Sequence, residues 1–294
     1  AGEECYRAIS LAPGYLPLHL RLAEILMAQD RFDEAIAKYM AVAETYLARG
    51  QARQAIGVYR QVLSLAPMDV AVRRKLIELL TESNQIDQAL EDYLALADAH
   101  YRMAQVEEAI EAYNQALRLA PRATAREAAE ARVLHGLGDI YLQSLDWLKA
   151  RKAYQRIIAL QPADLEARQR LMELSFRLGE RNAGLSQLDE LIAQHRAQGA
   201  VAALTTLLSE LTQANPQDIE IQRRAAAAYQ ALNLRTEAIA ALNALGELQL
   251  DAGQYADAAE TVRRLIALEP DKADDYRLLL QQILSRAGLG GGAG

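Results

Sequence analysis

Six prolines recur along this chain at a nearly constant spacing. The intervals between them are 54, 54, 41, 54 and 54 residues. In chain order they are Pro13, Pro67, Pro121, Pro162, Pro216 and Pro270. A period of this kind indicates supersecondary units that each bury an apolar face against their neighbours. The chain is therefore predicted to be a repeat protein, a class that usually works by presenting a surface.

Other residues keep fixed distances from these prolines. Leucine stands two positions before most of them, and alanine twelve positions before. The tyrosines eight positions before are Tyr59, Tyr113 and Tyr154. The position seventeen residues before the proline marks a break between helices. It is glycine in three units and is Ala104 or Leu145 in two others. Because small and large residues repeat in phase, the period belongs to the structure and not to the prolines alone.

Apolar residues recur with helical spacing through nearly the whole chain. Each 54-residue unit divides into three helices, whereas the 41-residue unit divides into two. From the second to the fourth proline, the expected helices are about 69–83, 86–103, 106–119, 124–143 and 147–160. Asp69 is expected to be an N-cap. Proline ends the last helix of each unit because it lacks a donor and biases the preceding residue away from the α region.

The connections between the expected helices are only a few residues long, which makes consecutive helices antiparallel neighbours. We therefore predict an all-α solenoid, an α-α superhelix of about sixteen antiparallel helices, over residues 1–287. The Gly-rich segment 288–294 is expected to be a flexible tail.

Charge and composition argue against several classes of partner. Acidic residues outnumber basic ones by 39 to 32, and the two kinds are interspersed. The basic patch of a nucleic-acid-binding protein is therefore missing. No apolar run approaches the roughly 20 residues that span a bilayer. The single cysteine, Cys5, excludes an internal disulfide. We expect a cytoplasmic protein with no nucleic-acid or membrane partner.

The sequence carries no pattern typical of catalysis or of metal binding. There is no HExxH, no Walker loop and no CxxC pair, and the four histidines are scattered. We expect no enzymatic activity, no metal and no cofactor in these residues.

The last two helices of each unit resemble the tetratricopeptide repeat. The best copy reads Leu137, Gly138, Tyr141, Trp147, Ala150, Tyr154, Ile158 and Pro162. Small residues let two antiparallel helices approach, and the aromatic residues fill the gap on the next turn. The departure from the family is the period, since its repeat has about 34 residues and two helices. The extra helices are about 16–29, 69–83, 163–178 and 218–232. In a two-layer stack, one added helix moves the first helix of the next repeat to the opposite layer. Successive units therefore either present opposite faces, or the extra helix lies across the stack.

The resemblance implies a right-handed superhelix with a concave groove lined by the first helix of each pair. The ninth position of that helix is Glu44, Asp98, Asp139, Ala193 and Glu247 in turn. Acids there would favour a basic or amine-bearing segment. His135, one turn before Asp139, is placed to donate to it and joins the partner-binding set. Alternatively, the acids are ordinary solvated helix positions and His135 is a polar groove residue.

We therefore expect a non-catalytic scaffold that binds a peptide or a partner surface, with a basic segment as one form of partner. Two alternatives remain. One is an assembly module that stacks end to end through uncapped apolar stripes, which include Cys5 and Ile9 at one end and Leu279, Leu280 and Ile283 at the other. The other is the regulatory arm of a larger signalling protein or enzyme. Because the chain begins in mid-repeat, we expect it to be a piece of a longer protein.

Overall fold

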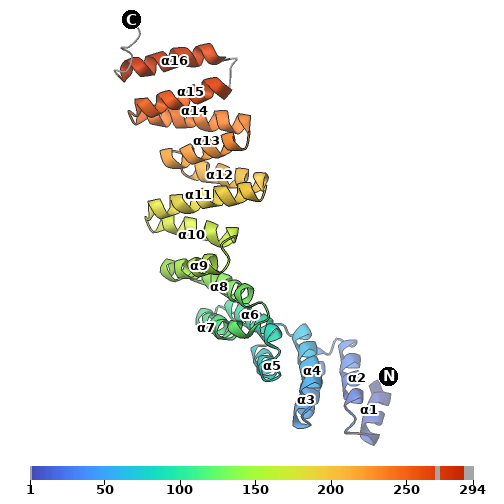
Figure 1. The fold of residues 1–294 in the computed structure, drawn as a ribbon. Coiled ribbons are helices and arrows are strands. Elements are labelled where there is room, and N and C mark those ends of the chain that lie inside the picture. Colours follow the sequence, from blue (N-terminus) through green and yellow to red (C-terminus); the bar gives the residue numbers. More distant parts are fainter. Residues whose placement is uncertain (1, 269–271, 288–294) are drawn as a thin grey trace. The chain divides into compact units, whose positions relative to one another are not determined.

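The protein is described by a computed structural model that covers residues 2–268 and 272–287. Within these residues the regular structure is helical throughout, with sixteen α-helices and one short 3-10 helix, η1. The predicted all-α class is confirmed. The contacts divide the chain into an N-terminal unit, Ala1–Asp164, and a C-terminal unit, Leu165–Gly294. Figure 1 shows the helices of each unit following one another in chain order.

The helices of the N-terminal unit are α1 (Gly2–Leu11), α2 (Leu16–Met27), α3 (Phe32–Ala48), α4 (Ala52–Leu65), α5 (Val70–Glu82), α6 (Ile86–Arg102), α7 (Val106–Leu119), η1 (Ala120–Arg122), α8 (Arg126–Gln143) and α9 (Trp147–Leu160). Those of the C-terminal unit are α10 (Leu165–Arg177), α11 (Arg181–Ala197), α12 (Val201–Ala214), α13 (Ile219–Ala231), α14 (Arg235–Asp251), α15 (Tyr255–Leu268) and α16 (Ala273–Arg286). The predicted bounds differ from these by at most two residues at each end. Pro270 and the predicted tail 288–294 lie outside the described residues.

Helix starts follow from capping. Asp69 accepts a hydrogen bond from the backbone amide of Val72 at 3.0 Å, as predicted. Asp146 accepts from the amide of Lys149 at 3.2 Å, and Asp218 accepts from the amides of two residues of α13. A carboxylate at this place satisfies amides that have no partner inside the helix.

Helix ends repeat with the same regularity. The five break positions seventeen residues before the prolines all have a left-handed backbone, with φ between 59° and 71°. Three of them are glycines, for which this conformation has no steric cost. The other two are Ala104 and Leu145, both with φ of 59°. The turn is therefore a property of the repeat, and two units adopt it with an unfavourable residue.

The inserted helices α2, α5 and α13 each contact the helix before and the helix after them. Each is thus one more member of its run of packed helices. In the 41-residue step no helix is inserted between α7 and α8, and there α6 contacts α8 directly. The ion pair between Glu91 of α6 and Arg132 of α8, at 2.6 Å, joins these two helices. At this place the first helices of two successive pairs are neighbours.

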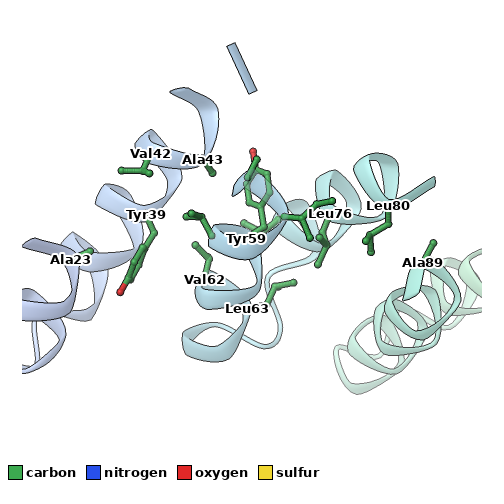
Figure 2. Packing of buried hydrophobic residues seen from close by; sticks show 14 of the residues in the cluster. Ala23, Tyr39, Val42, Ala43, Tyr59, Val62, Leu63, Leu76, Leu80 and Ala89 are labelled. Carbon is green, nitrogen blue, oxygen red and sulfur yellow. The ribbon is translucent and has the colours of Figure 1, made fainter. Parts of the chain in front are cut away.

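Tyrosines of the second helices fill the core of the N-terminal unit. Tyr59 is fully buried, and Figure 2 shows it beside Leu76 of α5, with Tyr39 of α3 facing the same cluster. Two glycines of α8 make room for the corresponding rings. A Cβ on Gly136 would lie 2.4 Å from the ring of Tyr113, and one on Gly138 would lie 2.7 Å from the ring of Tyr154. These glycines are therefore required by close packing.

A side chain six residues after the repeat proline fastens the inserted helix. His19 Nε2 lies 2.9 Å from the carbonyl of Pro13, and Arg73 donates to the carbonyl of Pro67 at 2.8 Å. The second guanidinium nitrogen of Arg73 donates to Asp92 of α6 at 2.9 Å, and both side chains are mostly buried. Burial acts to raise the pKa of Asp92, and the charge of Arg73 opposes it without cancelling it. In the C-terminal unit the residues at this position are Arg168 and Gln222. Arg168 donates a hydrogen bond to the side chain of Gln187, and Gln222 donates one to the carbonyl of Thr212.

The prediction of exposed apolar stripes on the first and last helices is wrong for their central residues. Cys5 is 7% exposed and donates to the carbonyl of Leu18 in α2. Ile283 is 2% exposed and packs with residues of α15. Cys5 is covered by α2 and Ile283 by α15, so the adjacent helix buries the centre of each stripe. The exposed apolar residues of α1 and α16 include Leu11 and Leu278.

Replacing Leu145 by glycine is expected to raise stability. Its backbone is left-handed, which costs a non-glycine residue about 1 kcal/mol, and its side chain is 70% exposed. We expect Leu145→Gly to raise the free energy of unfolding by up to about 1 kcal/mol, measured by urea denaturation. Gly50→Ala, at the same position of another unit, should lower it by a similar amount. A loss of stability in Leu145→Gly would contradict this account of the turn.

Asp218 is expected to make the stability of the C-terminal unit depend on pH. Burial acts to raise the pKa of Asp218, but hydrogen bonds from Arg181 and from the amides of Ile221 and Glu220 outweigh it and lower the pKa. A lowered pKa stabilises the fold above the pKa of the unfolded chain, about 3.9, and this contribution is lost as pH falls through the folded value. Asp218→Ala should therefore cost about 1 kcal/mol at about pH 7 and much less at about pH 3.

The measurement is urea denaturation of wild type and variant across this pH range. Asp251→Ala removes an exposed carboxylate of the same unit and serves as the control. An Asp218→Ala deficit that stays constant down to about pH 3 would exclude the assigned role of this carboxylate.

Candidate functional site

The charges of two of the predicted acids act on one tyrosine. Asp98 lies on α6 and Asp139 on α8, the two first helices that are neighbours. Between them, Tyr113 of α7 is partly buried. Burial raises the pKa of Tyr113, and the negative charges of Asp98 and Asp139 raise it further. The direct contact of α6 with α8 thus places the two carboxylates near one phenol.

One acid of a first helix forms a hydrogen bond with a tyrosine of the second helix. Tyr154 donates its hydroxyl hydrogen to Asp139 Oδ1 at 2.7 Å. The same offset of fifteen residues joins Asp98 to Tyr113 and Glu44 to Tyr59. For Tyr59, burial raises the pKa, Lys75 acts to lower it and Glu44 acts to raise it. The acids at this position therefore lie beside buried phenols.

The C-terminal unit lacks these pairs. Its residues at the same offset are Ala193 with Leu208 and Glu247 with Val262. An acid at the ninth position of the first helix therefore occurs together with a tyrosine in the N-terminal unit only. This pairing is visible in the sequence, and the offset of fifteen residues is the signal that would have found it.

The predicted residues have different partners. Glu44 pairs with Lys75 at 3.5 Å, and Asp98 pairs with Arg102 on its own helix at 2.9 Å. Glu247 is exposed on α14 of the C-terminal unit. Each predicted residue thus has its own surroundings, and the charges of Asp98 and Asp139 act on the same phenol.

The predicted hydrogen bond from His135 to Asp139 is wrong. His135 Nε2 lies 2.8 Å from Asp164 Oδ2, and the His135 ring meets the Tyr154 ring edge to face. Asp139 instead accepts from the Tyr154 hydroxyl. Spacing along α8 placed His135 and Asp139 on one face, but the partners that they contact come from the segments that follow.

The inserted helix α5 adds a cleft that the sequence analysis missed. This cleft, the α5–α7 cleft, has a volume of about 300 Å³ and lies between α5, α6 and α7. Its floor is apolar and is formed by Ile77, Tyr93, Leu96 and Ala112. Because each helix contributes a wall or the floor, the cleft exists only where a third helix joins the pair.

The rim of the α5–α7 cleft is charged. Its polar residues are Arg74, Glu78, Glu108, Glu111 and Gln115. Glu111 accepts hydrogen bonds from Arg118 at 3.0 Å and from Gln115 at 3.1 Å. Glu78 and Glu108 have no ion pair or hydrogen bond from their side chains to any residue that the structure describes. The rim therefore holds two carboxylates that are free to meet a ligand.

The described residues hold no group of three or more His, Cys, Asp or Glu side chains arranged to bind a metal ion. Among the same residues, no helix is both long enough and apolar enough to cross a membrane.

Removing the Asp139 carboxylate is expected to destabilise the N-terminal unit. Tyr154 is fully buried and donates to Asp139, so Asp139→Ala leaves its hydroxyl without this acceptor. We expect a loss of about 1–3 kcal/mol in the free energy of unfolding. Asp98→Ala, the equivalent change one repeat earlier, should cost less than about 0.5 kcal/mol because its ion pair is half exposed. Equal losses in urea denaturation would contradict the assigned bond.

Comparison with known proteins agrees with this geometry. Models of the tetratricopeptide repeat match residues 46–91, 86–163 and 241–276. Among solved structures, BtubC from P. vanneervenii is 19% identical, with 68% of this chain and 88% of that chain covered at a TM-score of 0.44. The apo form of the quorum sensor NprR from B. thuringiensis is 17% identical, with 90% and 81% covered at a TM-score of 0.47. MamA is 20% identical, with 54% and 96% covered at a TM-score of 0.33.

No curated protein sequence matches the chain. The three repeat matches together span more than half of its 294 residues, and they include α6 to α9, where two helix pairs follow each other without an insertion. The chain belongs to the tetratricopeptide repeat family.

Proposed function

We propose that this chain is a non-catalytic interaction scaffold and that its N-terminal unit binds a segment of a partner protein in the α5–α7 cleft. The observation that carries the proposal is the combination of an apolar floor with two free carboxylates at the rim. Ile77, Leu96 and Ala112 are buried below the opening, and Glu78 and Glu108 stand on opposite helices above it. Such a cleft fits an aliphatic side chain next to a basic one.

The charges around Tyr93 agree with this assignment. Burial raises the pKa of Tyr93, Arg118 and Arg74 act to lower it, and Glu78 acts to raise it. Arg118 pairs with Glu111, whereas Arg74 Nη2 lies 3.4 Å from His100 Nε2, a contact that leaves the charge of Arg74 in place. The rim therefore holds the carboxylates of Glu78 and Glu108 against the one guanidinium of Arg74, and a Lys or Arg side chain of the partner would neutralise the excess negative charge.

The acids predicted from the family position form a second version of the same function. Asp98 and Asp139 lie on α6 and α8, which contact each other, and Glu44, His135 and Glu247 complete the predicted set. This version also favours a basic partner segment. It differs from the cleft in the residues that bind, so variants can separate the two.

We expect the cleft variant to lose peptide binding. A displayed library of random linear peptides is selected on the full chain, and single peptides are then measured by fluorescence anisotropy. Selected peptides should carry Lys or Arg next to an aliphatic residue. Glu78→Lys with Glu108→Lys should weaken their binding at least tenfold, because each reversal replaces an attraction by a repulsion.

The matched control is Glu82→Lys with Glu107→Lys, which makes the same charge change on the same two helices outside the cleft. Glu44→Lys with Asp98→Lys and Glu247→Lys tests the family position. Loss of binding in this triple variant alone would favour the family position over the cleft. Peptides without basic residues, or binding that both sets of variants retain, would contradict a basic partner segment.

A further inference from the structure

A second open site in the N-terminal unit has the opposite character. This site, the α4–α6 groove, has a volume of about 730 Å³ and lies where the start of α4 faces the start of α6. Its polar side chains are those of Arg53, Arg60 and Ser83 and of four glutamines, Gln51, Gln54, Gln85 and Gln88. Of the described residues that line the groove, none is acidic, although acids outnumber bases in the chain.

The two arginines share one face of α4. They are seven residues apart, which is two helical turns or about 10 Å along the axis. Arg60 donates to Gln88 of α6, so its guanidinium is held at the groove. Arg53 is exposed and forms no hydrogen bond or ion pair with any residue that the structure describes. The groove therefore offers two positive charges with no ion pair to any described residue; Asp92, whose pKa the charge of Arg60 acts to lower, is paired with Arg73.

Gly57 lies between these arginines, and the packing of the fold does not require a glycine there. It is in the interior of α4, and a Cβ there would meet nothing within 4 Å. Glycine inside a helix costs about 1 kcal/mol relative to alanine. Gly136 and Gly138 differ, because aromatic rings cover them. The other second helices have Glu111, Lys152, Thr206 and Glu260 at this position, so the repeat does not require glycine.

We propose that the α4–α6 groove binds an extended acidic segment of a partner protein. The guanidinium groups of Arg53 and Arg60 pair with two carboxylates, an interaction for which their planar donors are suited. The glutamine amides both donate to and accept from the peptide backbone of the segment. Gly57 exposes the backbone of α4 and lets the segment approach closely.

The spacing of the arginines sets the spacing of the acids. About 10 Å is close to one turn of a polyproline II segment, three residues at about 3.1 Å each, and this conformation places side chains i and i+3 on the same side. The segment that fits best therefore carries Asp or Glu at positions i and i+3. This requirement is distinct from that of the α5–α7 cleft, which takes a basic segment.

The test uses the full chain and a displayed library of random linear peptides, followed by anisotropy on single selected peptides. Acidic peptides with Asp or Glu three residues apart should be enriched. Arg53→Glu with Arg60→Glu should weaken their binding at least thirtyfold. Arg126→Glu with Arg196→Glu makes the same charge change at exposed sites elsewhere and should change it less than twofold.

Gly57→Leu fills the groove without introducing charge. Because the site is open and leucine favours the helix, the variant should fold at least as stably as the wild type, as checked by circular dichroism. It should weaken binding of the acidic peptides at least tenfold. Ser64→Leu, at an exposed site of α4 outside the groove, should leave binding unchanged.

Four results would overturn the proposal. The first is a selection without enrichment of acidic peptides. The second is acidic peptides whose binding survives both Arg53→Glu with Arg60→Glu and Gly57→Leu. The third is competition by inorganic phosphate at equal concentration, which would identify a site for small anions. Loss of acidic-peptide binding only in Glu78→Lys with Glu108→Lys would also reject the groove, because those residues belong to the other cleft.

Discussion

The hydrogen bond from the inserted helix to the carbonyl of the repeat proline is the contact on which the units that begin after Pro13 and Pro67 depend. Proline ends a helix, and the carbonyl in the turn then lacks a helical partner. In the N-terminal unit, His19 and Arg73 reach back from the inserted helix to such a carbonyl. Arg73 also holds Asp92 of α6, so one side chain joins a turn and two helices. Since both partners are mostly buried, loss of either would leave a charge without compensation.

Most of the local structure could be predicted from the sequence, because it depends on short-range rules. Capping by Asp69, proline at the helix ends and apolar periodicity locate the helices within two residues. The break at Ala104 and Leu145 was also predicted, although its left-handed backbone was not. The contact of α6 with α8 could not be predicted, since periodicity gives the faces of a helix and not its neighbours. For the same reason the α5–α7 cleft and the bond from His135 to Asp164 became visible only in the structure.

The acids at the family position show how a structural role can resemble a binding role. Asp139 accepts from a buried tyrosine, and the charges of Asp98 and Glu44 act on two others. A carboxylate beside a phenol repeats with the packing, so its periodicity alone does not identify a ligand site. The α5–α7 cleft and the α4–α6 groove differ from these acids, because their charged residues do not repeat with the packing. Their charged residues differ from unit to unit and lie where α4, α5, α6 and α7 leave space.

The inserted helix can also be viewed as a removable part. The 54- and 41-residue steps differ by 13 residues, which is the length of α5. Because inserted helices contact mainly the helices next to them in sequence, omitting one lets the flanking pairs meet, as α6 and α8 do. Excision of a single helix thus changes both the length of the array and the set of helices that share a face. The chain holds a long and a short form of one building block, which makes it a natural template for designed arrays of adjustable length.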